Sequence, residues 1–196
     1  MGRKVAFQFD PKILAVLILG VSLIVTTGCL GSLDNDDDNT DEIIIPDHPQ
    51  IVRAEGMVDE GGNISMVFLD VDLYGDRGVD MRDVVVHILA TPNGGSAAEC
   101  DLTYGSFDQM DPESYVVREL FDPNNTWDPE GTPGSHILGK ECLLELEVNL
   151  TASGVPLPPD STLEIILHVT TSAHETYDLF RTPSGYPATG TVLLED

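Results

Sequence analysis

The stretch from Lys140 to Pro183 constrains the fold more than any other, because it holds two runs in which apolar and polar residues alternate. Apolar side chains take every second position of the first run: Cys142, Leu144, Leu146, Val148 and Leu150. They do the same in the second: Leu163, Ile165, Leu167 and Val169. A period of two is typical of a β-strand with one face buried and the other in water. The proline-rich turn at residues 153–161 stops either strand from continuing. Each apolar face therefore needs a second layer of structure to cover it.

Further strand-like runs follow one another between residues 50 and 196, with turn residues about every ten positions. Their predicted ranges are 50–58, 63–74, 83–91, 102–107, 114–121, 176–181 and 189–194. The run at 83–91 is apolar on both faces, which suits a central strand. No helical periodicity of useful length occurs after residue 30. We therefore predict an all-β domain over residues 50–196, an immunoglobulin-like antiparallel β-sandwich, preceded by one N-terminal hydrophobic helix.

Residues 1–30 are predicted to form a signal or anchor segment. Arg3, Lys4 and Lys12 precede an uncharged apolar run from Ile13 to Thr27. The run is short for a membrane span and within the length of a signal-peptide core. Basic residues before it and acids after it place the N-terminus inside and the bulk of the chain outside the membrane. The following residues 31–49 are rich in aspartate and are predicted to be a disordered acidic tether.

Two interpretations of the leader remain open. Thr26-Thr27-Gly28-Cys29 resembles a lipobox, in which a signal peptide is cut before a cysteine that then carries lipid, although Thr26 stands where leucine is usual. Archaeal pilin-type subunits also begin with a basic stub and an apolar helix, but their cleavage motif is not visible here. Under both interpretations, the expected location is the extracellular side of a membrane, with Cys29 as the candidate lipidation site.

The formal net charge of −25 excludes some partners. Nucleic acid requires a basic face, and an anionic membrane surface attracts basic segments, so neither is expected to bind the globular part. The acidic excess is interpreted mainly as a solvated surface screened by salt, and alternatively as a sink for cations.

If Cys29 carries lipid, Cys100 and Cys142 remain as a possible disulfide pair, with two buried free thiols as the alternative. A disulfide closing a loop of this length would add about 3–4 kcal/mol of stability by the chain-entropy argument. Asn63, Asn124 and Asn149 each begin an N-glycosylation sequon. On an external surface these asparagines become candidate attachment points for glycans.

Signals for catalysis or for a cofactor are weak. The five histidines lack the spacing of a zinc site, and no phosphate-binding loop, dinucleotide fingerprint or nucleophile elbow occurs. Glu145 and Glu147 share a strand face, but a solvated face is favoured over a glycosidase pair. Asp70 and Asp72, with nearby Asp76, are candidate ligands of a surface calcium ion. Trp127, in a loop at 122–135, either packs onto the edge of the sandwich or contacts a neighbouring protein.

Residues 50–196 also resemble the outer β-sandwich domain of archaellins, the filament subunits of the archaeal swimming organelle. The resemblance lies in VVRELFDPNNTWDPEGTPGSHILGKECLLELEV (116–148), in the closing hairpin within 150–183, in FRTPS (180–184) and in Val192-Leu193-Leu194. Gly56 and Gly62-Asn63-Ile64, ahead of a long alternating strand, are compatible with it. Gly139-Lys140 stands where archaellins usually have Gly-Asp. The resemblance implies an archaellin-like sandwich and contacts with other subunits.

The N-terminus departs from the archaellin pattern, because the apolar run stops near Leu30 and acids follow. Membrane-anchored flagellin-like accessory proteins, including stators, fit both halves of the chain better. The sequence therefore predicts a non-enzymatic archaeal surface protein, a component or accessory of an archaellum or type IV pilus-like filament. Expected partners are archaellin or pilin-like subunits, S-layer or envelope proteins, and other copies of the chain. A lipid-anchored protein that captures a ligand or cation is the alternative.

Overall fold

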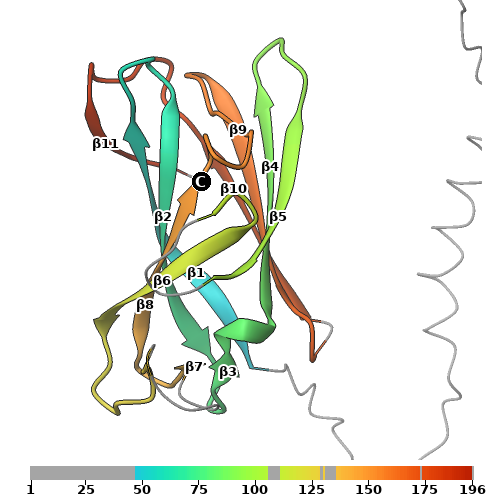
Figure 1. Ribbon diagram of the computed structural model, residues 1–196, viewed down its shortest axis with the longest axis vertical. Coiled ribbons are helices and arrows are strands. Elements are labelled where there is room, and N and C mark those ends of the chain that lie inside the picture. The colour runs from blue at the N-terminus through green and yellow to red at the C-terminus, as the bar shows by residue number, and fades with distance from the viewer. Residues whose placement is uncertain (1–46, 106–110, 129, 131–135, 173, 196) are drawn as a thin grey trace, which may run out of the picture. The chain divides into compact units, whose positions relative to one another are not determined.

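The computed structural model describes residues 47–105, 111–128, 130, 136–172 and 174–195 (Figure 1). These residues belong to the second of two compact units, which begins at Ile44. The hydrophobic leader, Cys29 and nearly all of the predicted tether lie outside the described residues. Within the described part, no helix has the length and apolar character needed to cross a membrane.

The described chain is nearly all strand, as the alternating sequence predicts. The strands are β1 (His48–Val58), β2 (Ile64–Tyr74), β3 (Val79–Asp80), β4 (Val84–Pro92), β5 (Ala98–Tyr104), β6 (Ser114–Phe121), β7 (Ile137–Leu138), β8 (Leu143–Asn149), β9 (Ser161–Val169), β10 (His174–Arg181) and β11 (Gly190–Leu193). One 3-10 turn, η1 (Met81–Asp83), precedes β4 among these residues. Strands β3 and β7 have two residues each, which is too short for an alternation of apolar and polar residues to be recognised in the sequence.

Nine strands form one curled sheet in the order β10-β9-β4-β5-β6-β8-β2-β1-β11. The β10-β9-β4-β5 part faces the β6-β8-β2-β1-β11 part, and the two enclose the core as the layers of a sandwich (Figure 1). Strand β4 lies between β9 and β5, so the prediction of a central strand is confirmed. The sheet is not antiparallel throughout, because β5 and β6 meet in a short parallel pair at Thr103–Ser114 and Tyr104–Tyr115.

The two strands with the strongest sequence signal lie in different layers. β8 pairs with β2 and β6, whereas β9 pairs with β4 and β10. The proline-rich segment between them is thus a crossover, held by the bridge between Ile64 and Leu157. Val155 and Leu157 are buried along it, and this burial fixes its path over the end of the sandwich. The apolar faces of both strands are buried in the shared core between the layers.

The core is built from aliphatic side chains, each of which contributes about 1.5–3 kcal/mol by leaving water. One polar group is buried at its centre. The hydroxyl of Tyr115 lies 2.8 Å from the carbonyl oxygen of Met81 and 3.0 Å from that of Val84. Tyr115 therefore joins β6 to η1 and the start of β4, where the two layers meet.

Candidate interaction surface

A row of charged side chains crosses the outer face of the β6-β8-β2-β1 layer. Strand register places Arg53 opposite Asp70, Asp70 opposite Glu145, and Glu145 opposite Arg118. We call these four residues, together with Glu147 two positions along β8, the charged ladder. Arg118 forms an ion pair with Glu147, and its Nη2 lies 3.1 Å from Oε2. Arg53 Nη1 lies 3.7 Å from Asp70 Oδ2.

Carboxylates of the charged ladder are less exposed than the sequence suggests. Asp70 is 9% exposed and Glu147 8%, because neighbouring side chains cover them. Burial raises the pKa of Asp70, Arg53 opposes the rise, and Glu55 adds to it. Burial also raises the pKa of Glu145, with further contributions from Asp70 and Glu147. The expectation of a freely solvated acidic face is therefore wrong for this part of β8.

The arrangement does not favour the glycosidase alternative for Glu145 and Glu147. The carboxylate of Glu147 is occupied by the guanidinium of Arg118. Neither glutamate lines any of three surface depressions that the described residues form between β1 and β10, beside the β4–β9 end, and beside η1. Two of the three carboxylates in the charged ladder are thus paired with a cation, Asp70 with Arg53 and Glu147 with Arg118.

A cleft opens where the two ends of the curled sheet approach each other. It has a volume of about 490 Å³ and lies between β1, β10 and the end of β11. Its lining is Ile51, Val52, Arg53, Ala54, Asp178, Phe180, Leu193, Leu194 and Glu195. We call it the β1–β10 cleft. Val52 and Leu193 are 51% and 53% exposed, so its rim presents apolar surface to solvent.

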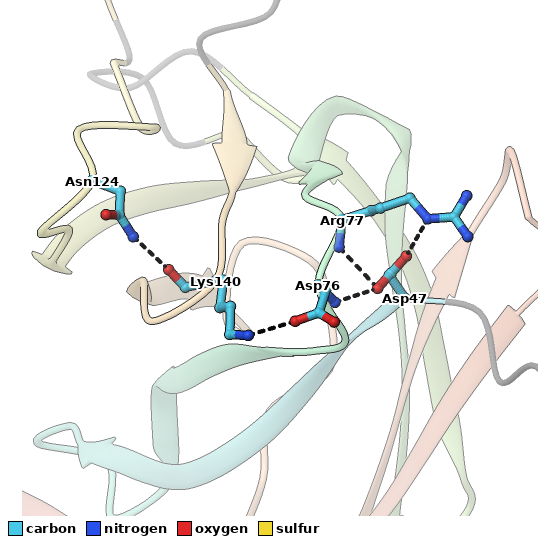
Figure 2. Close-up of polar contacts among 5 residues, drawn as sticks. All are labelled: Asp47, Asp76, Arg77, Asn124 and Lys140. Carbon is cyan, nitrogen blue, oxygen red and sulfur yellow. Dashed lines mark hydrogen bonds and ion pairs between the residues drawn. The ribbon is translucent and has the colours of Figure 1, made fainter.

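The three calcium candidates are not brought together. Asp70 is in the charged ladder, and Asp76 accepts from Lys140 Nζ over 2.5 Å at another place on the surface (Figure 2). In Figure 2, Asp47 accepts hydrogen bonds from the backbone N–H groups of Asp76 and Arg77, at 2.6 and 3.0 Å. Those bonds, above all the one from Arg77, hold the pKa of Asp47 below its ordinary value. The part of the chain that the structure describes contains no cluster of three or more metal-ligating side chains.

The predicted disulfide is wrong, because Cys100 and Cys142 are both free thiols. Cys142 precedes the first residue of β8, whereas the thiol of Cys100 interacts with Ser153, beyond the last residue of β8. Strand β8 separates these positions by roughly 20 Å, whereas a disulfide requires Cα atoms within about 7 Å. Burial raises the pKa of the Cys100 thiol and raises that of Cys142 to about 11.

The three sequon asparagines differ in exposure. Asn124 is exposed in the loop after β6, whereas Asn63 and Asn149 are half-buried at strand ends. Asn124 donates from Nδ2 to the carbonyl oxygen of Lys140 over 3.0 Å (Figure 2). Asn149 Oδ1 accepts from the backbone N–H of Ala152. Asn124 is therefore the most accessible of the candidate glycan sites.

Trp127 packs onto the sandwich edge, 3% exposed, so the first of its two interpretations is confirmed. It forms an edge-to-face cluster with Tyr104 and His136, with ring centroids 5.4–6.1 Å apart. His87 is half-buried, and its Nδ1 lies 2.6 Å from Asp101 Oδ1 on the next strand. Sequence spacing alone could not have found these contacts, because they join residues distant in the chain.

The two layers and the curled sheet define the described part of the chain as an immunoglobulin-like β-sandwich. Its fold is similar to the crystal structure of archaeal flagellin FlaB1 from Methanocaldococcus jannaschii. The TM-score is 0.61 at 18% identity, over 76% of this chain and 97% of that chain. The chain thus has an archaellin-like fold, as the sequence resemblance implies.

Two further solved structures, both from Sulfolobus acidocaldarius, show a weaker similarity. The archaellum periplasmic stator protein FlaG gives a TM-score of 0.42 at 14% identity, over 69% of this chain and 100% of that chain. The stator protein complex of FlaF and FlaG gives 0.42 at 12% identity, over 76% and 100%. No known protein family and no curated protein matches the sequence.

Proposed function

We propose that this protein is a non-enzymatic structural protein of the archaeal cell surface. It acts as a component or membrane-anchored accessory of an archaellum or type IV pilus-like filament, through protein–protein contacts. The observation that carries the proposal is the extent of the structural likeness, since the described sandwich matches 97% of a solved archaellin structure. The charged ladder and the β1–β10 cleft supply surfaces for such contacts.

The sequence around the tether favours an anchored accessory over a polymerising subunit. Asp34, Asp36, Asp37 and Asp38 follow the apolar run closely. Burying these carboxylates in a dry filament core would cost several kcal/mol each. An anchor that ends near Leu30 instead holds the sandwich on the outer face of the membrane, where it can contact archaellin-like subunits or envelope proteins.

A lipid-anchored binding protein is the second candidate. The lipobox-like residues before Cys29 favour it. The β1–β10 cleft is also in the volume range of small-ligand sites. Both candidates share the anchor and the extracellular location, so they differ in what the sandwich binds.

Mass spectrometry of the native N-terminus, together with purification of surface filaments from the same cells, separates the candidates. For the anchored accessory we expect a chain that is lipidated at Cys29 or uncleaved, and that co-purifies with filament subunits after cross-linking. A lipidated chain that is never cross-linked to filament subunits favours the binding protein. A mature chain that begins just before Ile13 inside purified filaments would show a polymerising subunit instead.

Glycosylation is part of the proposal and is tested separately. Asn124 is expected to carry the highest occupancy, because its side chain is the most exposed of the three. Glycopeptide mass spectrometry of the native protein measures all three sites at once. Asn124→Gln should then remove most of the glycan mass, whereas Asn63→Gln serves as the matched control. Occupancy confined to Asn63 or Asn149 would contradict the assignment.

A further inference from the structure

A polar depression lies on the outer face of the β10-β9-β4-β5 layer, where β4 ends and β9 begins (Figure 1). Its volume is about 370 Å³, which is within the range of small-ligand sites. We call it the Arg181 pocket, after the one cation in its described lining. Apart from Pro92, the lining consists of polar residues and glycine, so a complementary ligand would itself be polar.

Arg181 differs from the other lysines and arginines of the described residues, because it forms no ion pair with a carboxylate there. The others each do: Arg53, Arg77, Arg82, Arg118 and Lys140. The formal net charge of the chain is −25, so acids greatly outnumber cations. A guanidinium pairs with a carboxylate through two parallel hydrogen bonds. A carboxylate on a ligand would therefore fill the place that an acidic side chain takes beside the other cations.

Two hydroxyl groups lie in a row with Arg181. Strand register places Thr91 opposite Thr162, and Thr162 opposite Arg181, so the three side chains share one face of neighbouring strands. At the usual spacing of strands, the row spans roughly 10 Å. No hydrogen bond within the described part of the chain uses the hydroxyl of Thr91 or Thr162. By contrast, Thr182 Oγ1, also in the lining, accepts from the backbone N–H of Ser161 over 2.8 Å.

The end of the pocket along β4 and β9 is closed by Asn93 and Asp160. Asn93 donates from Nδ2 to Asp160 Oδ2 over 2.5 Å, and from its backbone N–H to the Asp160 carbonyl oxygen over 3.2 Å. Asp160 N–H donates to the carbonyl oxygen of Pro183 over 3.0 Å. Asp160 has a φ of 58°, in the left-handed region that residues other than glycine rarely adopt. These bonds join three separate segments, so the pocket is already formed before a ligand arrives.

The pocket thus has a cation at one end, hydroxyls in the middle and a carboxylate acceptor at the other end. A matching ligand carries a carboxylate for Arg181, and hydroxyls that exchange hydrogen bonds with Thr91, Thr162 and Asp160. A phosphate dianion fits less well, because a single arginine faces it and Asp160 would repel its second charge. We propose that the Arg181 pocket binds a polyhydroxylated carboxylate, the chemical class of the uronic and aldonic acids. The inference goes beyond the proposed function, since neither candidate function uses this pocket.

Ligand-observed NMR tests the proposal on the full chain, in micelles of a detergent without a sugar head group. Saturation transferred from the protein to a small molecule reports binding, and a titration gives the dissociation constant. The probe is methyl β-D-glucuronide, which combines a carboxylate with ring hydroxyls, and we expect transfer to its ring protons. Methyl β-D-glucoside lacks the carboxylate and glutarate lacks the hydroxyls, so each should bind at least about tenfold more weakly.

Three variants test the assignment of the site. Arg181→Gln should raise the dissociation constant of the glucuronide at least about tenfold, because it removes the paired cation. Arg77→Gln is the matched control, since it removes the same charge from the β2–β3 turn and should change the constant less than about twofold. Thr162→Val keeps the β-branched shape but loses the hydroxyl, and should raise the constant by about threefold to tenfold. Thermal melting checks that each variant is folded.

Gluconate, an open-chain acid, distinguishes the sources of such a ligand. The blocked anomeric carbon of the glucuronide resembles that of a sugar within a glycan, so binding of the glucuronide alone supports a glycan as the source. Binding of both compounds supports a free hydroxy acid. Three outcomes would each overturn the proposal: no transfer at millimolar glucuronide, displacement of the glucuronide by an equal concentration of inorganic phosphate or glutarate, or equal affinities in Arg181→Gln and Arg77→Gln.

Discussion

Asp70 and Glu145 lie directly opposite each other on β2 and β8, two carboxylates side by side within the charged ladder. Like charges facing each other across a sheet are destabilising, and burial adds to the cost. Arg53 and Arg118 flank the pair on the outer strands, so the ladder has a basic residue at each end. The pKa of each carboxyl is raised, chiefly by burial.

Glu145→Gln should stabilise the protein at neutral pH. A carboxyl whose folded-state pKa lies above its unfolded value favours folding while protonated, and it loses that contribution as the pH rises through the raised pKa. The amide mimics the protonated form, so we expect the melting temperature to rise by about 1–3 °C at pH 7. The gain should shrink as the pH falls toward about 4, where Glu145 itself is protonated. Glu60→Gln, in the exposed β1–β2 turn, is the control, and an equal gain there would contradict the assignment.

Arg118→Ala should destabilise the fold, because it leaves Glu147 buried without its cation. Arg118 is itself half exposed, so we expect a loss of about 1–2 kcal/mol in the free energy of unfolding. Denaturant titration measures the loss. Adding Glu147→Gln should recover most of it, since the neutral amide no longer needs the guanidinium. If the double variant is as unstable as Arg118→Ala, the ion pair is not the cause.

Tyr115→Phe should cost about 1–2 kcal/mol at every pH from 5 to 9, since it removes a buried hydroxyl whose one proton is within hydrogen-bond distance of the carbonyl oxygens of Met81 and Val84. Burial raises the pKa of Tyr115 far above its usual value, so the hydroxyl stays neutral throughout that range. Tyr177→Phe is the matched control. Tyr177 is 55% exposed on β10, so its variant should melt within about half a kcal/mol of the natural protein.

Cys100 and Cys142 should both be alkylated without prior reduction. In the native protein the reaction should be slow, because burial raises both thiol pKa values. Cys100, which is half-buried, should react before the fully buried Cys142. Iodoacetamide labelling followed by peptide mass spectrometry gives the two rates. A disulfide-linked pair of peptides containing Cys100 and Cys142 would contradict the free thiols of the structure.

Calcium should leave the melting temperature unchanged, because Asp70, Asp72 and Asp76 do not converge and Asp76 is paired with Lys140. A ligand that binds only the folded state raises the apparent stability in proportion to the logarithm of its concentration. Differential scanning calorimetry in millimolar calcium and in EDTA therefore decides the matter. A rise of several degrees in the melting temperature with calcium, lost in Asp76→Asn, would show that calcium binds at Asp76.

The strand pattern was largely determined by the sequence. Alternation with a period of two reports which side chains face the core, and it needs no partner strand to be visible. β2, β4, β8 and β9 were therefore predicted to within about two residues at each end. The positions of the turns could also be predicted, because proline and glycine restrict or widen the backbone angles at their own positions whatever the tertiary structure.

Strand pairing, by contrast, was decided only in the tertiary structure. Neighbouring β8 and β9 lie in different layers, with β8 between β2 and β6 and β9 between β4 and β10. The pairing of β6 with β8 places Arg118 opposite Glu145 and within reach of Glu147, a relation between residues distant in the chain. Period and composition carry no information on which strands become neighbours. Every cross-strand contact, including the β1–β10 cleft, therefore depends on how the sheet curls.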